Sequence, residues 1–373
     1  MKTPSSEDSR PESRRSLRKI VRGLTFGFLT AGLGLLLLVG TTNRIGSDPG
    51  GWLAVPALVL PHLATSIGLG VLLFALGTRP KKWPRRLLAA WALVVGVIWI
   101  PGWFPRGAIG KSDPVRVISW NVQRLGEFAP WLQVEEAERE ALQCVANAIL
   151  REDPDLVTLL EISARRLEDL ADRASLTCVH TPYLGEGPSV GGLAACVRGD
   201  EWTLTQARDL PLPPDWRYVF AELERGDRRL NLVSIHLRPP GISGEELRET
   251  LGGLADGEPE PLLDLGRTLR STTRAQDREV AELLADLQTF RDPTVVAGDF
   301  NSTPDTAIHA TLRKTLVDSW MKSGLGLGAT RTFGDWLPLR IDFIYLRDLV
   351  PGSATVLDDP CSDHKGLVAT VGW

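Results

Sequence analysis

The sequence predicts a mixed α/β domain that follows a helical membrane anchor, and three observations support this architecture. The first 106 residues contain three long stretches without a charged side chain. The same residues carry an excess of basic side chains, whereas the rest of the chain carries an excess of acidic ones. Beyond about residue 111, short β-branched runs occur together with amphipathic helical patterns. We therefore expect two unlike parts within one chain.

The average composition conceals this division. The 373 residues are 43% hydrophobic and 24% charged with a formal net charge of −4, values typical of a soluble globular protein. Residues 1–106 hold 14 Lys and Arg but only 4 Asp and Glu, a net charge of +10. Residues 107–373 hold 28 basic and 42 acidic residues, a net charge of −14. The composition excludes a disordered tail protein, a collagen and a small disulfide scaffold.

Three uncharged stretches predict a membrane anchor at residues 23–106, after a basic tail at residues 1–22. They are Gly23–Asn43, Pro49–Thr78 and Leu87–Pro105, with 21, 30 and 19 residues. A helix of about 20 residues crosses a hydrocarbon core about 30 Å thick, so each stretch is long enough to span a bilayer. We expect three transmembrane helices, with the lipid bilayer as their partner.

The distribution of Lys and Arg predicts how the anchor is oriented. The tail has seven, the first loop has one, the second loop at residues 79–86 has five, and few follow the third span. Basic loops favour the cytoplasm, which places the N-terminus inside and the C-terminal domain outside the inner, or cytoplasmic, membrane. Ser13–Lys19 partly resembles a twin-arginine export signal, and a cleaved signal peptide is another alternative. We favour an uncleaved anchor because two further spans follow the first.

The C-terminal domain, residues 107–373, is predicted element by element from its periodicity. Apolar runs predict strands at 115–119, 155–160, 230–235, 294–297, 340–345 and 367–371. Stripes at helical spacing predict two helices, one with Leu142, Val145, Ala146 and Ile149, the other with Val280, Leu283, Leu284 and Leu287. Gly241–Gly266 is rich in Gly, Pro and Glu and is expected to be a long loop or a partly helical insertion.

The chain has four cysteines, at Cys144, Cys178, Cys196 and Cys361. An extracytoplasmic location would permit disulfides, and four cysteines allow three complete pairings. Cys178 and Cys196 are candidates to face each other across neighbouring strands. The alternative is that all four are small buried hydrophobic residues.

Polar side chains at the predicted strands together predict the chemistry. They are Asn121, Glu161, His236, Asp299, Asn301, Asp342, Asp363 and His364. Most of them follow a strand, whereas Asp342 interrupts the strand at 340–345, and Asp363 and His364 stand just before the last strand. Carboxylate and amide oxygens bind a hard cation such as Mg²⁺ or Mn²⁺, which neutralises charge on phosphoryl oxygens. An Asp can orient or deprotonate water, and a His paired with an Asp can stabilise a transition state. The set predicts metal-dependent hydrolysis of a phosphate ester.

The order of these motifs resembles the endonuclease/exonuclease/phosphatase superfamily. The matching motifs are Ser119-Trp-Asn121, Pro154 to Glu161, Ser234-Ile-His236, Gly298-Asp-Phe-Asn301, Arg340-Ile-Asp342 and Ser362-Asp363-His364. The motif with His236 is similar to that of the deoxyribonuclease and sphingomyelinase branches. The chain as a whole resembles a membrane-anchored bacterial type of this superfamily. The resemblance implies a four-layer sandwich of two mostly antiparallel sheets flanked by helices, with the site at one end between the sheets.

The resemblance also implies which residues hold the metal. Glu161 would be the principal ligand of Mg²⁺ or Mn²⁺, and Asn121 and Asp363 would lie near the ion. No other cofactor is implied.

The resemblance implies roles in the reaction for the other motif residues. Asp299 would orient or deprotonate the attacking water, and Asn301 would bind a phosphate oxygen. His364 would contact the scissile phosphate as base or electrostatic stabiliser, oriented by Asp342. His236 would assist the leaving group or stabilise the phosphoryl oxygens.

The charge of the C-terminal domain bears on its substrate. A nuclease generally carries a basic face, whereas this domain has a net charge of −14. We therefore favour a phosphodiester or phosphomonoester of a lipid headgroup or small molecule as substrate. An extracytoplasmic nuclease is the first alternative, and a non-catalytic, membrane-tethered binding module is the second. The complete set of motif residues argues against the binding module, and no obligate protein partner is evident.

Overall fold

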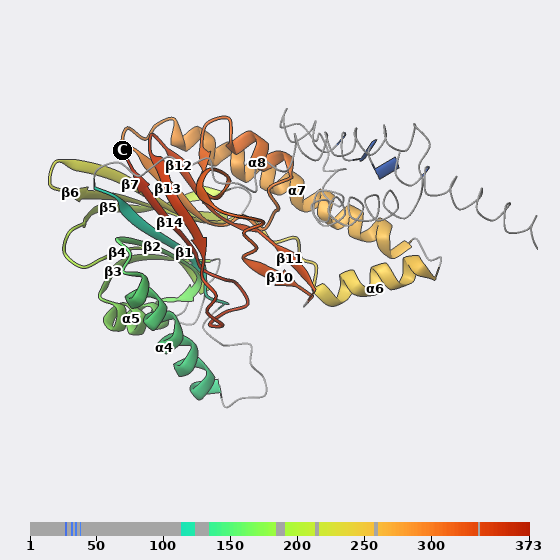
Figure 1. Cartoon of the computed structure of the whole chain (residues 1–373), viewed down its shortest axis with the longest axis horizontal. Coiled ribbons are helices and arrows are strands. Elements are labelled where there is room, and N and C mark those ends of the chain that lie inside the picture. Colours follow the sequence, from blue (N-terminus) through green and yellow to red (C-terminus); the bar gives the residue numbers. More distant parts are fainter. Residues whose placement is uncertain are drawn as a thin grey trace, which may run out of the picture. The chain divides into compact units, whose positions relative to one another are not determined.

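The computed structural model describes residues 113–123, 134–183, 191–212, 216–256, 260–334 and 336–373, and a few single positions between residues 27 and 38 (Figure 1). Apart from those positions, the predicted tail and three membrane spans lie outside the described residues. Within the part that is described, no helix combines the length and the apolar character needed to cross a membrane. The chain divides into two units, and the elements below belong to the larger one, which includes Pro101–Trp373.

The first of two six-stranded sheets is centred on β1 (Val115–Asn121) and β2 (Leu156–Ser163), which are parallel neighbours. Its other neighbouring strands are antiparallel. In spatial order the strands are β13 (Val350–Val356), β14 (Leu367–Gly372), β1 (Val115–Asn121), β2 (Leu156–Ser163), β4 (Gly191–Arg198) and β3 (Leu176–Pro182). Three of the predicted strands are confirmed as β1, β2 and β14, with slightly different ends.

The second sheet has the same plan, because β7 (Arg228–His236) and β8 (Thr294–Asp299) are parallel and the remaining neighbours are antiparallel. In spatial order the strands are β5 (Thr203–Leu212), β6 (Trp216–Arg225), β7 (Arg228–His236), β8 (Thr294–Asp299), β12 (Asp342–Arg347) and β9 (Val317–Asp318). The predicted strands at 230–235, 294–297 and 340–345 are confirmed as β7, β8 and β12. Both sheets are therefore mixed, with one parallel pair each.

Three apolar cores hold the layers together. One joins the facing sides of the two sheets, where Val117 and Leu160 share a core with Leu232 and Val295. A second packs the outer face of the first sheet against α4 (Val134–Glu152) and α5 (Ala164–Ala174). The third packs the outer face of the second sheet against α7 (Glu260–Leu287) and α8 (Ala307–Leu312). The predicted sandwich of two sheets flanked by helices is confirmed (Figure 1).

The segment Gly241–Gly266 is partly helical, so the alternative of an unstructured long loop is wrong. It contains α6 (Gly244–Ala255) and the beginning of α7. A capping box starts α6: the Ser243 N–H donates to Glu246 Oε2 at 2.7 Å, and the Glu246 N–H donates to Ser243 Oγ at 3.1 Å. The described chain also contains α9 (Ser319–Ser323) and a hairpin of β10 (Arg331–Phe333) and β11 (Leu337–Leu339).

All four cysteines form disulfides, which excludes the alternative of four free buried thiols. Cys178 and Cys196 are paired positions of β3 and β4, as their candidate placement across neighbouring strands required. Cys144 of α4 is joined to Cys361, across 217 residues of sequence. The second disulfide fixes the loop before His364 to a helix on the outer face of the first sheet.

Candidate active site

Strand alternation directs four of the predicted site residues into the space between the sheets. In β8, Val295 and Ala297 belong to the core between the sheets, and Asp299 is the next residue on that side. The same alternation applies at the ends of three other strands, to Asn121 of β1, His236 of β7 and Asp342 of β12. All four side chains are buried. One end of the sandwich thus collects two carboxylates, an amide and an imidazole.

The register of the second sheet sets three of these residues side by side. His236 is paired with Asp299 across β7 and β8, and Asp299 is paired with Asp342 across β8 and β12. Gly298 permits the close approach of β7, because a Cβ at this position would lie 1.7 Å from the Ile235 carbonyl oxygen. The Gly-Asp sequence is therefore required by packing as well as by chemistry.

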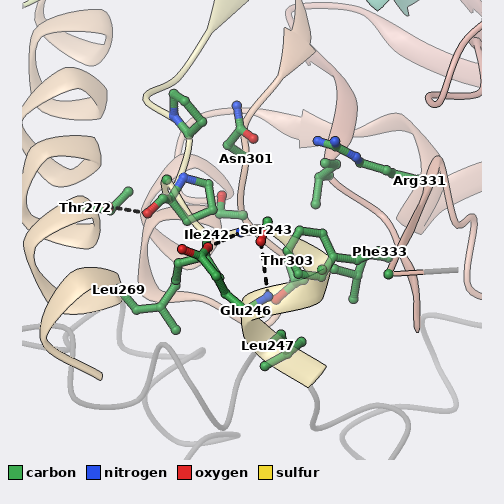
Figure 2. Close-up of a pocket in the computed structure, with 18 of the residues that line it drawn as sticks. Ile242, Ser243, Glu246, Leu247, Leu269, Thr272, Asn301, Thr303, Arg331 and Phe333 are labelled. Carbon is green, nitrogen blue, oxygen red and sulfur yellow. Dashed lines mark hydrogen bonds between the residues drawn. The ribbon is translucent and has the colours of Figure 1, made fainter. Parts of the chain in front are cut away.

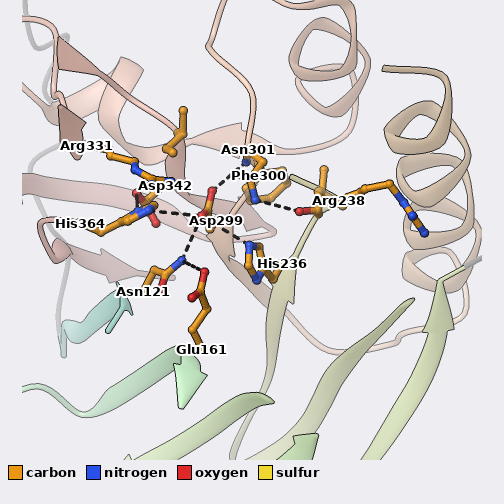
Figure 3. A network of polar contacts seen from close by, with 12 residues as sticks. Asn121, Glu161, His236, Arg238, Asp299, Phe300, Asn301, Arg331, Asp342 and His364 are labelled. Carbon is orange, nitrogen blue, oxygen red and sulfur yellow. Dashed lines mark hydrogen bonds and ion pairs between the residues drawn. The ribbon is translucent and has the colours of Figure 1, made fainter. Parts of the chain in front are cut away.

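Glu161 reaches the same space through a break in the regular strand. Alternation alone would place it with Val157 and Leu159 on the helix-facing side of β2. The register between β2 and β4 shifts around Glu161, which has a φ of 57°. A bulge of this kind re-aims a side chain. Its Oε1 accepts a hydrogen bond of 2.9 Å from Asn121 Nδ2 (Figure 3).

Asp299 is the centre of the site and is only 1% exposed. Its Oδ1 accepts a hydrogen bond of 2.8 Å from the Asn301 N–H. Its Oδ2 accepts a hydrogen bond of 3.2 Å from Asn121 Nδ2. The same oxygen lies 3.6 Å from Nε2 of His236 and 3.7 Å from Nε2 of His364 (Figure 3). One carboxylate oxygen therefore lies within reach of two imidazoles.

His364 is held firmly although it lies in a loop. Its Nδ1–H donates to Asp342 Oδ2 at 2.9 Å. Its carbonyl oxygen accepts from Trp120 Nε1 at 3.0 Å, and its N–H donates to Ser362 Oγ at 3.2 Å. The Ser362 hydroxyl in turn donates to the Asn121 carbonyl oxygen at 2.9 Å. These bonds tie the loop to β1 and aim Nε2 of His364 at Asp299.

The charges in this cluster shift two pKa values. Burial alone would lower the pKa of His364, but the carboxylates of Asp342 and Asp299 outweigh it and raise the pKa to about 9. Burial raises the pKa of Asp299, and repulsion from Asp342 adds to this, while the two imidazoles act in the opposite direction. His364 is therefore a cation at neutral pH.

Tyr183 is a member of the cluster that the sequence did not single out. Its hydroxyl lies 2.6 Å from His236 Nδ1 and accepts a hydrogen bond of 3.2 Å from the Glu161 N–H. Because this oxygen already accepts from Glu161, its own proton can be donated to His236 Nδ1. Tyr183 comes directly after β3, so its position at a strand end was the signal in the sequence.

Asn301 and Asp363 lie at the border of the cluster. Asn301 has a φ of 48°, a left-handed conformation that Asn tolerates, and its Nδ2 donates to the Leu237 carbonyl oxygen at 2.9 Å. The carboxylate of Asp363 forms an ion pair of 2.8 Å with Arg331. The structure thus brings Asn301 next to Asp299 and pairs Asp363 with the guanidinium group of Arg331.

The oxygen atoms of this site suit a hard divalent cation. The Glu161 carboxylate lies beside the Asn121 side chain, and carboxylate and amide oxygens are the donor types that Mg²⁺ and Mn²⁺ accept. In this structure Asn121 Nδ2 faces Glu161, and Asn121 Oδ1 accepts from the Gln123 N–H at 3.1 Å. Asp299, Asp342 and His364 also place one ligand-type atom each within 4.8 Å of one another. However, His364 Nδ1 and Asp342 Oδ2 already share a hydrogen bond, so these two residues form an Asp–His pair. The Glu161–Asn121 pair fits a metal better.

Solved structures with the same fold include enzymes of different specificity. The human Nocturnin catalytic domain with bound sulfate is 19% identical, with a TM-score of 0.52, covering 70% of this chain and 94% of that one. A mannosyl-6-phosphatase from Bacteroides thetaiotaomicron is 14% identical, with a TM-score of 0.54, covering 69% and 100%. D. rerio TDP2 complexed with a single strand DNA product is 16% identical, with a TM-score of 0.52, covering 70% and 100%.

At these identities the likeness to solved structures shows the fold alone. No curated protein matches the sequence. A family model described as the Endonuclease/Exonuclease/phosphatase family matches residues 118–364, a range that contains all eight predicted site residues. The match covers more than half of the chain, and the chain therefore belongs to the endonuclease/exonuclease/phosphatase family.

Proposed function

We propose that the chain is a membrane-anchored, divalent-metal-dependent phosphoesterase whose catalytic domain lies outside the cytoplasmic membrane. One observation carries the catalytic part of this proposal: the buried Asp299 carboxylate lies within 3.7 Å of two imidazoles. It also accepts a hydrogen bond from Asn121, which contacts Glu161. A general base, a cationic donor and a pair of metal-binding oxygens then surround the place for one phosphate.

In this proposal Asp299 positions the attacking water and accepts its proton. His364 acts as a cation, because a pKa of about 9 keeps it protonated at neutral pH. Its Nε2–H then donates to a phosphoryl oxygen and stabilises the charge that develops there. Asp342 holds the ring in this orientation through Nδ1. The raised pKa favours the electrostatic role of His364 over the role of base.

His236 and Asn301 complete the contacts with the phosphate. When Tyr183 donates to Nδ1 of His236, the ring proton resides on Nε2, which faces the site. That N–H can then donate to the leaving oxygen or to a phosphoryl oxygen. One N–H of the Asn301 side chain donates to Leu237, and the other remains for a phosphate oxygen. The hydrogen bonds in the site support these proposed roles.

Glu161 and Asn121 would hold Mg²⁺ or Mn²⁺, with Asp363 near the ion. The bound ion would neutralise charge on the phosphoryl oxygens. Asp363 would contribute only by loosening its ion pair with Arg331. Among the residues that the structure describes, no Lys or Arg forms an ion pair with Glu161, and this supports Glu161 as the principal ligand.

The disulfides support a catalytic domain outside the cytoplasm. Disulfides persist in oxidising compartments and are rare in the cytosol, and all four cysteines of the chain are paired. The net charge of −14 over residues 107–373 disfavours a polyanion. We therefore propose a lipid headgroup or small-molecule phosphate ester as substrate, with nucleic acid as the competing outcome.

The test uses the full-length chain in lipid nanodiscs with added Mg²⁺ or Mn²⁺. Substrates are bis-p-nitrophenyl phosphate, a sphingomyelin, a phosphatidylinositol phosphate, nucleotides and plasmid DNA. We expect hydrolysis of at least one phosphate ester that stops in EDTA and returns with the metal. Hydrolysis that is unaffected by EDTA would disprove the metal mechanism.

Matched variants separate the site from general damage to the protein. Glu161→Gln and His364→Ala are expected to lose activity, whereas Glu168→Gln on the exposed side of α5 is expected to keep it. Cleavage of plasmid DNA in preference to the lipid and small-molecule esters would replace the favoured substrate class. A C-terminal alkaline phosphatase fusion that stays inactive would disprove the outside location.

A further inference from the structure

A cavity of about 870 Å³ lies beside the active site and is not used by the proposed reaction. Its walls come from α6, α7 and the β10–β11 hairpin, together with the segments that follow β7 and β8. The segment around α6 is the one whose role the sequence left open. Figure 2 shows side chains from these elements around one common space. The size suits a small-molecule ligand or the organic part of a substrate.

Most of the wall is apolar. Leu247 of α6, Leu265 and Leu269 of α7, Phe333 and Leu339 of the hairpin, and Ile341 line the cavity. These side chains come from segments far apart in the sequence, and Leu269 is only 9% exposed. A ligand that fills the cavity covers the apolar surface that these side chains still expose there, which favours an apolar group.

The cavity wall is fastened on its outer side. The Arg248 Nη2 donates to the Gly334 carbonyl oxygen at 2.9 Å. A Cβ at Gly244 would lie 2.4 Å from Gly334 Cα, so α6 and the hairpin touch through two glycines. The capping box of Ser243 and Glu246 fixes the start of α6. The cavity is thus part of the built structure and does not depend on closure of a loop.

The cavity joins the active site through Asn301, Asp363 and Arg331, which all line it. Asn301 donates to Asp299, and Arg331 pairs with Asp363 next to His364. Asn301 and Arg331 are labelled both in the cavity of Figure 2 and in the polar network of Figure 3. A group attached to a phosphate at Asp299 can therefore extend into this space.

The charges of the lining exclude a second phosphate deep in the cavity. Among the described residues that line it, Arg331 is the one Lys or Arg, and it lies on the side of Asp363. Helix α6 contributes Glu245, Glu246 and Glu249 to the lining. A nucleic acid would bring further phosphates towards these acidic residues, whereas a hydrocarbon group would not.

We propose that this cavity binds the apolar group of an amphiphilic phosphate ester, an alkyl or acyl chain attached next to the scissile phosphate. The proposal rests on the proposed function, because it names the substrate class of the same site. The phosphate lies at Asp299 and the two imidazoles, and the chain lies among Leu247, Leu265 and Leu269. Arg331, where the two parts meet, forms a hydrogen bond or ion pair with the phosphate.

The test measures how chain length affects hydrolysis and binding. The full-length protein in nanodiscs, with Mg²⁺, hydrolyses p-nitrophenyl alkyl phosphates with methyl, butyl and hexyl groups, and empty nanodiscs serve as the blank. We expect kcat/KM to rise roughly two- to fourfold for each added methylene that is buried. Calorimetric titration with ethyl, butyl and hexyl phosphate gives the same dependence as a fall in Kd, without requiring turnover.

The matched variants are two leucines on one helix. Leu269→Gln places a polar group in the cavity, whereas Leu263→Gln changes a side chain that is 57% exposed on α7. We expect Leu269→Gln to lose at least about tenfold in kcat/KM on the hexyl ester, to lose less than about twofold on the methyl ester, and to flatten the series. Leu263→Gln is expected to behave as wild type. Leu247→Gln, in α6, repeats the test from the other wall if Leu269→Gln does not fold.

The outcomes distinguish the two proposals. Hydrolysis of all three esters at one rate, with equal Kd values for the alkyl phosphates, overturns the cavity proposal and leaves the proposed function standing. A chain-length dependence that persists in both Leu269→Gln and Leu247→Gln also overturns it. Absence of hydrolysis, together with a Kd that falls with chain length and is lost in Leu269→Gln, retains the binding site and disproves the proposed function.

Discussion

The two sheets contribute different chemistry to one site. The first sheet supplies Asn121 and Glu161, an amide and a carboxylate that lie 2.9 Å apart, with Glu161 in a strained left-handed backbone conformation. The second sheet supplies His236, Asp299 and Asp342 from paired positions of three neighbouring strands. The first contribution suits metal binding, whereas the second suits proton transfer and charge stabilisation.

This difference shows how the fold separates the two tasks. The second sheet buries Asp299 almost completely, which raises the pKa of its carboxyl, and the carboxylates of Asp342 and Asp299 raise the pKa of His364 against the effect of its burial. The first sheet leaves Glu161 partly exposed, where an incoming hydrated cation can reach it. If the separation is real, variants of the two sheets should fail in different ways.

The largest effect is expected from Asp299→Asn, which keeps the shape and removes the proposed base. We expect kcat/KM to fall by about 10³-fold or more, because general base catalysis and the pairing with two imidazoles are both lost. Added Mg²⁺ should not restore the rate. Asp200→Asn, an exposed change, serves as the control. A loss below about tenfold would remove Asp299 from the centre of the mechanism.

The next effect concerns stability and pH, and it depends on the carboxylates that the second sheet places beside His364. The pKa of His364 is raised from 6.5 to about 9, so the stability that its cation contributes is fully present below pH 6.5 and is lost as the pH rises through 9. The cation of His364 therefore contributes about 3 kcal/mol to the free energy of unfolding, because each unit of pKa shift corresponds to about 1.36 kcal/mol. Urea unfolding of the metal-free protein between pH 6 and 10 measures it.

His364→Gln is the control for this pH dependence, since the variant lacks the titrating group. We expect the difference in the free energy of unfolding between wild type and His364→Gln to shrink as the pH rises from 6.5 to 9. A difference that stays constant over this range would mean that the carboxylates do not hold the imidazole as a cation.

A smaller effect, of a different kind, is expected in the first sheet. Glu161→Gln keeps the hydrogen bond with Asn121 but weakens the metal site by removing one charge. We expect the Mg²⁺ concentration at half-maximal activity to rise about 10- to 100-fold, with much of the rate restored at saturating metal. Activity against metal concentration measures this shift. An unrecoverable loss, as for Asp299→Asn, would break the proposed division between the sheets.

The two sheets also differ in how far the sequence predicts them. In the second sheet regular alternation and the strand ends were sufficient, because His236 and Asp299 end their strands and Asp342 begins its strand without a break. In the first sheet the position of Glu161 depends on a bulge, which is set by pairing with β4 and leaves no periodic signal. The motif identified Glu161, but only the structure explains how its carboxylate reaches Asn121.

Other features depended on contacts between distant segments. The link of Cys144 to Cys361 spans 217 residues, and four cysteines alone did not determine it. The helical character of α6 was one of two alternatives, because the Gly and Pro content of Gly241–Gly266 favours a loop while the capping box at the start of α6 favours a helix. The cavity depends on how α6, α7 and the hairpin pack, which no local pattern in the sequence specifies.

The smallest effect is expected from Tyr183→Phe. The substitution removes a hydroxyl that links the two sheets through hydrogen bonds. The Tyr183 hydroxyl contacts His236 of the second sheet and accepts from the N–H of Glu161 in the first. Its removal leaves both groups without this partner, and we expect kcat/KM to fall about 5- to 20-fold with little change in metal dependence. Steady-state kinetics at several Mg²⁺ concentrations measure both quantities, and Tyr218→Phe, whose hydroxyl bonds Asp286 far along the chain, is the matched control. A large change in the metal requirement would instead assign Tyr183 to the first sheet, as a residue that positions Glu161.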